Sequence, residues 1–210
     1  MNELINFLIE IGKLKKIKRK GWIIRKVKNP ETIADHSFRI AILAWFLGKE
    51  KRFDTKKILK MALIHDLCEV YAGDITPYDK ILPKDKKQQK KVLKKWPRFS
   101  KSEDIERLLE KHKKEWKSLV RLTSKLPSET REEIINLWLD YEECLTKEGH
   151  FVRQVDKIEN LLQALEYWKK DKKFPIKPWW VEIKETIDDP LLLQFIDTLD
   201  KKFHQKKKSK

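Results

Sequence analysis

The chain has 210 residues, of which 40% are hydrophobic and 39% are charged, and it carries a formal net charge of +16 at pH 7. This length and hydrophobic fraction predict a single folded domain over residues 1–210 and exclude a disordered chain, which has too few apolar residues to form a core. The longest apolar run, Ile40–Leu47, is too short for a membrane span of about 18 residues, and the two cysteines lie too far apart for a C-x-x-C motif.

Helical periodicity dominates the sequence. Apolar residues recur at steps of three and four, there are only 5 glycines and 8 prolines, and no segment alternates apolar and polar residues as a strand would. These features predict an all-α fold. We expect helices over residues 3–15, 29–49, 55–70, 128–149, 151–170 and 189–203.

Capping and helix-breaking residues set the boundaries of these helices. The segment Asn29-Pro30-Glu31-Thr32 is typical of a helix start, with a cap residue, an early proline and an acid in the first turn. Asp54 is suited to cap the next helix, and Gly73 marks its exit into a polar loop at residues 74–77. The segments predicted to connect helices are a basic stretch at 16–28 and a proline-containing linker at 175–178.

Lysine-rich segments interrupt the pattern. Residues from about 84 to 125 predict a charged helical excursion, with helical patches around Trp96 and Trp116, and residues 203–210 predict a frayed basic tail. Lysines also gather at residues 13–28, just before the candidate site described next. Two interpretations are open: a surface that attracts phosphates or nucleic acid, or a solvated lysine-rich surface of the kind found in heat-adapted organisms.

Two histidines and two aspartates occupy positions that are otherwise apolar. His36 shares a helix stripe with isoleucines and leucines, His65 shares one on the next helix, and Asp66 is turned about 100° from His65 in a regular helix. Asp156 lies beside the apolar stripe of the helix at 151–170. Imidazole and carboxylate groups in such places are costly unless something binds them, and a divalent metal is the usual binder. The arrangement predicts one ion in the groove between helices.

Each of these residues also has an ordinary interpretation. A single histidine on an apolar face is more often a hydrogen-bonded core residue, and a single Asp156 would more often be exposed to solvent. Two histidines on consecutive helices, one followed directly by an aspartate and both ahead of a polar loop, favour the metal site. Ligands carried on separate helices nevertheless have no signature as tight as H-E-x-x-H.

The split pattern His36 … His65-Asp66 … Asp156 resembles the HD superfamily of metal-dependent phosphohydrolases, and within it the 5'-deoxynucleotidase branch. The resemblance runs from the first helix to about Trp168. It implies an all-α HD-domain helical fold, here with a lysine-rich helical insertion. The matching stretches are GWIIR at 21–25, PETIADHSFR at 30–39, HDLCE at 65–69, GDITP at 73–77 and FVRQVDKIE at 151–159.

The resemblance also implies the cofactor and the residues that act on it. The four residues of the split pattern would hold one divalent ion, which is manganese, cobalt or magnesium in such proteins. Glu69 would then manage the proton of the attacking water, and Asp74 would contact the sugar or the phosphate. In an alternative arrangement Glu69, Asp74 and the carbonyl of Ile75 hold a second ion.

The resemblance also implies that Trp22 lines the site of the sugar, where it excludes a 2'-hydroxyl and so favours deoxyribose. Asp66, Asp74 and Pro77 are further expected substrate contacts. Some members of the family carry an arginine directly before this tryptophan, where this chain has Gly21. The arginine that orients the phosphate is therefore expected elsewhere. The candidates are Arg19 and Arg25.

These observations favour a metal-dependent phosphohydrolase that releases phosphate from deoxynucleoside 5'-monophosphates. We expect a homodimer, as in its relatives, and a cytoplasmic location, since the chain shows no signal-peptide pattern and no membrane contact. One alternative is an HD phosphohydrolase acting on another nucleotide, and a second is a basic nucleic-acid-binding protein with a vestigial site. The complete ligand set disfavours the second, because a decayed site would have lost at least one costly buried ligand.

Overall fold

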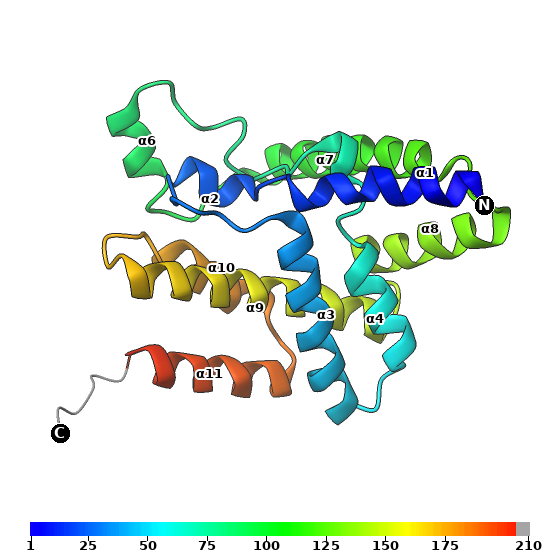
Figure 1. Cartoon of the computed structure of the whole chain (residues 1–210). Helices are drawn as coiled ribbons and strands as arrows, with labels where there is room; N and C mark the ends of the chain where they lie inside the picture. The colour runs from blue at the N-terminus through cyan, green and yellow to red at the C-terminus, as the bar shows by residue number, and fades with distance from the viewer. Residues whose placement is uncertain (205–210) are drawn as a thin grey trace.

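The computed structural model describes residues 1–204, and most of the predicted basic tail, residues 205–210, lies outside them. Within the described residues no strand forms beyond one isolated bridge between Lys18 and Thr32, which confirms the all-α prediction (Figure 1). None of these helices is long and apolar enough to cross a membrane. The helices are α1 Asn2–Ile11, η1 Gly12–Lys15, α2 Lys20–Ile24, α3 Ile33–Glu50, α4 Thr55–Ile64, α5 Glu69–Ala72, α6 Lys86–Val92, α7 Lys101–Thr123, α8 Ser128–Glu143, α9 Lys147–Lys170, α10 Lys177–Thr186 and α11 Pro190–His204.

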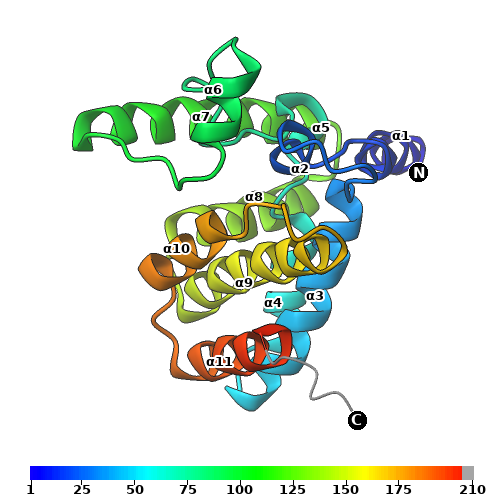
Figure 2. The ribbon, with the colours of Figure 1, turned by 90° about the vertical axis from the view of Figure 1, so that its left-hand side faces the viewer.

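Helix α9 runs through the middle of the fold, with α3, α4, α8, α10 and α11 packed against it (Figure 2). Burial of each aliphatic side chain contributes about 1.5–3 kcal/mol, so this helix anchors the core. Because α9 is covered on most sides, its polar residues Asp156 and Glu159 are buried too and need partners. Its fully buried aliphatic residues are Val152, Val155, Ile158, Leu161, Ala164 and Leu165.

Helix α3 begins at Ile33, directly after the predicted start segment at 29–32, and its cap is Thr32 instead of Asn29. The Thr32 hydroxyl accepts a hydrogen bond from the backbone N–H of Asp35 at 3.1 Å, and the Asp35 carboxylate accepts one from the backbone N–H of Thr32 at 2.8 Å. A cap of this kind is worth about 1 kcal/mol. It fixes the first turn of α3 and thereby the position of His36, which follows directly.

The helix predicted over residues 55–70 is interrupted. Helix α4 ends at Ile64, a turn covers residues 65–68, and the short α5 begins at Glu69. Gly73, with a φ of 73°, ends α5 in a conformation that favours glycine. His65 and Asp66 therefore lie in this turn and not within a continuous helix.

Other boundaries differ from the sequence prediction. The basic connector contains the short helix α2, and the predicted linker is the start of α10, in which Pro178 takes an early position that helices tolerate. Trp116 lies in α7 as expected, but Trp96 lies in a non-helical segment. Helix α8 ends at the left-handed Cys144, and Thr146 caps α9 four residues earlier than predicted.

Candidate metal centre and substrate cavity

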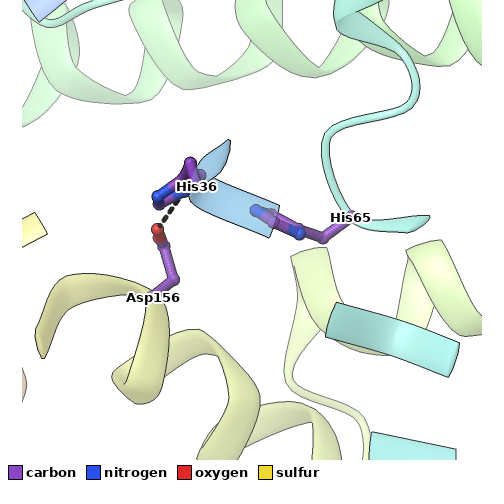
Figure 3. Close-up of side chains that lie close together, drawn as sticks. All are labelled: His36, His65 and Asp156. Carbon is purple, nitrogen blue, oxygen red and sulfur yellow. Dashed lines mark ion pairs between the residues drawn. The ribbon is translucent and has the colours of Figure 1, made fainter. Parts of the chain in front are cut away.

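The side chains of His36, His65 and Asp156 meet at one place, although they come from α3, the turn after α4, and α9 (Figure 3). One possible ligand atom of each lies within 4.8 Å of the others. The Nε2 atom of His36 is 3.1 Å from Oδ1 of Asp156. All three residues are buried, at 0%, 2% and 5% exposure. These are the ligands that the split sequence pattern predicts.

Asp66, the fourth expected ligand, borders the same place. Its Oδ2 atom is 3.2 Å from Nε2 of His65 and 3.7 Å from Nε2 of His36. The structure therefore brings together all four residues expected to hold the first ion.

Both imidazole rings are oriented by a second contact. Nδ1 of His36 is 2.5 Å from Oε2 of Glu159, and Nδ1 of His65 is 2.8 Å from the carbonyl oxygen of Ala62. If each Nδ1 donates the proton, each Nε2 is left with a lone pair that faces the site. Both Nε2 atoms are buried, and neither has a hydrogen-bond partner among residues 1–204. Two such nitrogens beside two carboxylates form a donor set that suits a divalent cation.

The carboxylates around the ligand cluster favour a positive charge within it. Burial and the Arg19 guanidinium oppose protonation of His36, but the carboxylates of Glu159 and Asp156 outweigh them and raise its pKa to about 10. Burial opposes ionisation of Asp156, yet Lys157 and His36 hold its pKa well below the ordinary value. A metal ligand must give up its proton. A cation bound here would therefore replace the proton of the His36 imidazole as the positive charge of the site.

A cavity of about 590 Å³ opens beside these ligands. Such a volume lies within the range of pockets that hold small molecules. One part of its wall comes from α7, and another comes from the C-terminal end of α8 and from residues within α9 and α10. The remaining wall includes most of the other residues predicted for the site: Asp66, Glu69, Asp74, Ile75 and Pro77.

Glu69 is a buried acid that faces this cavity. Its side chain is only 5% exposed, and its Oε2 atom has no hydrogen-bond partner within the described part of the chain. Burial, followed by the nearby carboxylates of Asp66 and Asp74, raises the pKa of Glu69 well above the ordinary value. Asp74 is held differently, because its Oδ2 atom accepts a hydrogen bond from the backbone N–H of Lys20 at 2.6 Å. Glu69 therefore has an oxygen available for a proton or an ion.

Of the two arginines considered for the phosphate, Arg19 is the one beside the ligands. It donates hydrogen bonds to Asp66 at 2.9 Å and to Asn160 at 3.0 Å. Arg25 lies between the rings of Tyr78 and Trp179, with its guanidinium 4.6 and 4.4 Å from their centroids. Arg25 instead borders a second, smaller cavity of about 150 Å³.

Trp22 borders the smaller cavity as well. The ring is 2% exposed and stacks on Trp179, with centroids 5.0 Å apart and planes 18° apart. Its Nε1 donates a hydrogen bond to Glu31 at 2.8 Å. Trp22 therefore combines a core position with one edge of a cavity, and it does not line the larger cavity that contains Asp66 and Asp156.

Two residues of the site were not predicted from the sequence. The Nζ atom of Lys157 is 3.2 Å from Oδ2 of Asp156 and 3.5 Å from Oε1 of Glu182, and the hydroxyl of Tyr141 donates a hydrogen bond to Asp156 at 3.1 Å. A lysine directly after a buried aspartate is a sequence signal for Lys157. The sequence contains no such signal for Tyr141, because a tyrosine on α8 is equally suited to an ordinary core position.

Comparison with known proteins agrees with this site. A family model described as HD domain matches residues 11–96 and 100–184. A 5'-deoxynucleotidase HDDC2 from Dictyostelium discoideum is 35% identical to this chain, over 97% of this chain and 92% of that protein. The human 5'-deoxynucleotidase HDDC2 is also 35% identical, over 78% of this chain and 68% of the human protein. A solved structure of a conserved hypothetical protein from Pyrococcus furiosus is 28% identical, with a TM-score of 0.68 over 94% of this chain and 99% of that one. The chain therefore belongs to the HD domain family.

Proposed function

We propose that this protein is a metal-dependent 5'-deoxynucleotidase that releases phosphate from deoxynucleoside 5'-monophosphates. The observation that carries the proposal is the pair of buried Nε2 atoms of His36 and His65, directed with Asp66 and Asp156 at one point beside a cavity of about 590 Å³. The relatives named 5'-deoxynucleotidase support the choice of substrate, since their similarity covers most of this chain.

A divalent cation held by these four residues would supply Lewis-acid polarisation of a phosphoryl oxygen and a lowered pKa for water. Mixed nitrogen and oxygen donors suit manganese or cobalt better than they suit magnesium. Arg19 and Lys157 add positive charge at the same end of the cavity, where a phosphate oxygen can take the place of the carboxylates that they now contact. The phosphate of a nucleotide is thereby oriented toward the ligand cluster.

Glu69 has the position and the protonation behaviour of a proton carrier. Its carboxyl faces the cavity three residues after Asp66, and burial together with the carboxylates of Asp66 and Asp74 raises its pKa well above the ordinary value. We propose that it takes the proton from the attacking water. The alternative is that Glu69, Asp74 and the carbonyl of Ile75, which line the same wall, hold a second ion.

Chelation is expected to abolish phosphate release, and manganese or cobalt should restore it, because a bound cation would lower the pKa of the attacking water whose proton Glu69 takes. The test is phosphate release by chelator-treated protein from a panel of deoxy- and ribonucleoside mono- and triphosphates, with manganese, cobalt and magnesium added separately. Undiminished activity in protein shown to be metal-free by elemental analysis would contradict the metal site. Release from triphosphates alone would identify a different nucleotide as substrate.

We also propose that the protein is a homodimer in which a second copy covers the outer face of α3. Phe38, Ile42, Trp45 and Phe46 lie along this face at steps of three and four, and exposures of 65% for Phe38 and 63% for Phe46 are high for such residues. A contiguous exposed apolar patch marks an interaction surface, and the dimers expected from the resemblance supply the occupant. Replacing Phe38 and Phe46 by serine should convert a dimer to a monomer in sedimentation analysis. A monomeric wild-type protein would contradict the proposal.

A further inference from the structure

The two cavities share an aromatic residue. Trp96 lines both the cavity of about 590 Å³ and the adjoining cavity of about 150 Å³. It comes from the non-helical segment between α6 and α7, within the charged stretch at 84–125, and it is not one of the proposed metal ligands. Leu108 and Leu109 of α7 add apolar surface to the larger cavity. An apolar wall in a cavity whose other walls are charged suits the uncharged part of a ligand.

The other aromatic rings that line the cavities already have a partner on their faces. Trp22 stacks on Trp179, and the Arg25 guanidinium lies against both Trp179 and Tyr78. In the larger cavity, Tyr141 lies 5.0 Å from the His65 ring and 5.3 Å from the Arg153 guanidinium. Within residues 1–204, Trp96 is the cavity-lining aromatic side chain that has neither a ring nor a guanidinium packed on it.

The segment that carries Trp96 is attached on both sides of the ring. The hydroxyl of Tyr78 donates a hydrogen bond to the carbonyl of Lys95 at 2.8 Å, and Arg98 makes a bidentate pair with Glu185 of α10, at 2.9 and 2.5 Å. Leu93, just before, is buried at 5% exposure. The backbone just before Trp96 is therefore held by Leu93 and by the loop at 74–82, and the exposed pair of Arg98 with Glu185 adds a weaker contact to α10. A ring held in this way binds a flat ligand at a lower cost in conformational entropy.

We propose that Trp96 is the stacking platform for the nucleobase of the substrate. The proposal rests on the function proposed above and extends it, because it assigns recognition of the base to the segment between α6 and α7. The cation site, Arg19 and Lys157 would bind the phosphate, and the indole of Trp96 takes the base where the two cavities adjoin. Every nucleobase has a π-face, so such a platform recognises nucleotides as a class over phosphate esters that lack a base.

The test compares a substrate with a base and one without. Loss of a base–aromatic stack weakens binding by about 5- to 100-fold, so Trp96→Ala should raise the KM for deoxyadenosine 5'-monophosphate by that factor while kcat is retained. The kcat/KM for 2-deoxyribose 5-phosphate should be unchanged. Trp96→Phe keeps an aromatic face and should restore most of the affinity. Trp168→Ala, the same change at a half-buried tryptophan that lines neither cavity, should alter neither substrate.

An equal loss for both substrates, or an unchanged KM for the nucleotide, would overturn the proposal. Failure of the proposed function has a different result, namely no phosphate release from any deoxynucleotide by the wild-type protein. In that case, the affinity of the metal-loaded protein for deoxyadenosine 5'-monophosphate, measured by calorimetry, tests whether Trp96 binds the base. Binding that is lost in Trp96→Ala and retained in Trp96→Phe supports the platform, whereas equal binding by all variants, or none by the wild type, contradicts it.

Discussion

Replacing His65 by alanine is expected to remove metal binding and phosphate release together. His65 supplies one of the two buried Nε2 atoms that have no partner among the described residues, and its ring is already oriented by the Ala62 carbonyl. Changing a residue that merely orients a metal ligand typically costs about 10–100-fold in affinity, so removing a ligand should cost more than about 100-fold. The measurements are bound metal by elemental analysis and phosphate release under saturating manganese or cobalt.

His112 offers a matched control. It also lines the large cavity, but its ring packs on Trp138 and it lies outside the ligand cluster. His112→Ala should retain both metal and activity. A ligand that binds only the folded state raises the melting temperature, so added metal should stabilise the wild type and His112→Ala but not His65→Ala. A His65→Ala protein that binds metal like the wild type would show that this histidine is an ordinary core residue.

The burial of the proposed metal ligands could be predicted because it is encoded locally. His36 follows a capped helix start and continues an apolar stripe, so its place in the core follows from helical spacing alone, and the structure buries it completely. Asp156 could be placed beside the core of its helix in the same way. What spacing could not supply was the meeting of three helices at one point, which came from the resemblance to the HD superfamily.

The turn at residues 65–68 and the contributions of distant residues could not be predicted. No glycine or proline marks the interruption after Ile64 in the sequence. The turn is instead stabilised by tertiary contacts, such as the hydrogen bond that the Ser118 hydroxyl donates to the carbonyl of Cys68. Arg19 reaches Asp66 and Asn160 over 47 and 141 residues of sequence, and such pairs leave no periodic pattern. The short helix α2 contains one lysine, but the basic residues on both sides of it favour a connector by composition.

Replacing Glu69 by glutamine is expected to lower turnover by about 10²–10⁴-fold while the ion at His36, His65 and Asp156 is retained, because general acid–base help is worth that factor in rate. Glutamine keeps the size of the side chain but cannot take a proton from water. The raised pKa of Glu69, which burial, Asp66 and Asp74 produce, is the property that the substitution removes. The measurements are kcat for a deoxynucleoside 5'-monophosphate and the metal content of the same preparation.

Glu182 supplies the control, because it is a second buried glutamate of the same cavity, with 9% exposure, and it pairs with Lys157 rather than facing the metal ligands. Glu182→Gln should change kcat far less than Glu69→Gln does. The metal content then separates the two roles that are open for Glu69. A proton carrier leaves the stoichiometry of bound ions unchanged, whereas the loss of one ion in Glu69→Gln would make Glu69 a ligand, with Asp74 and the Ile75 carbonyl completing a second ion site on the same wall of the cavity.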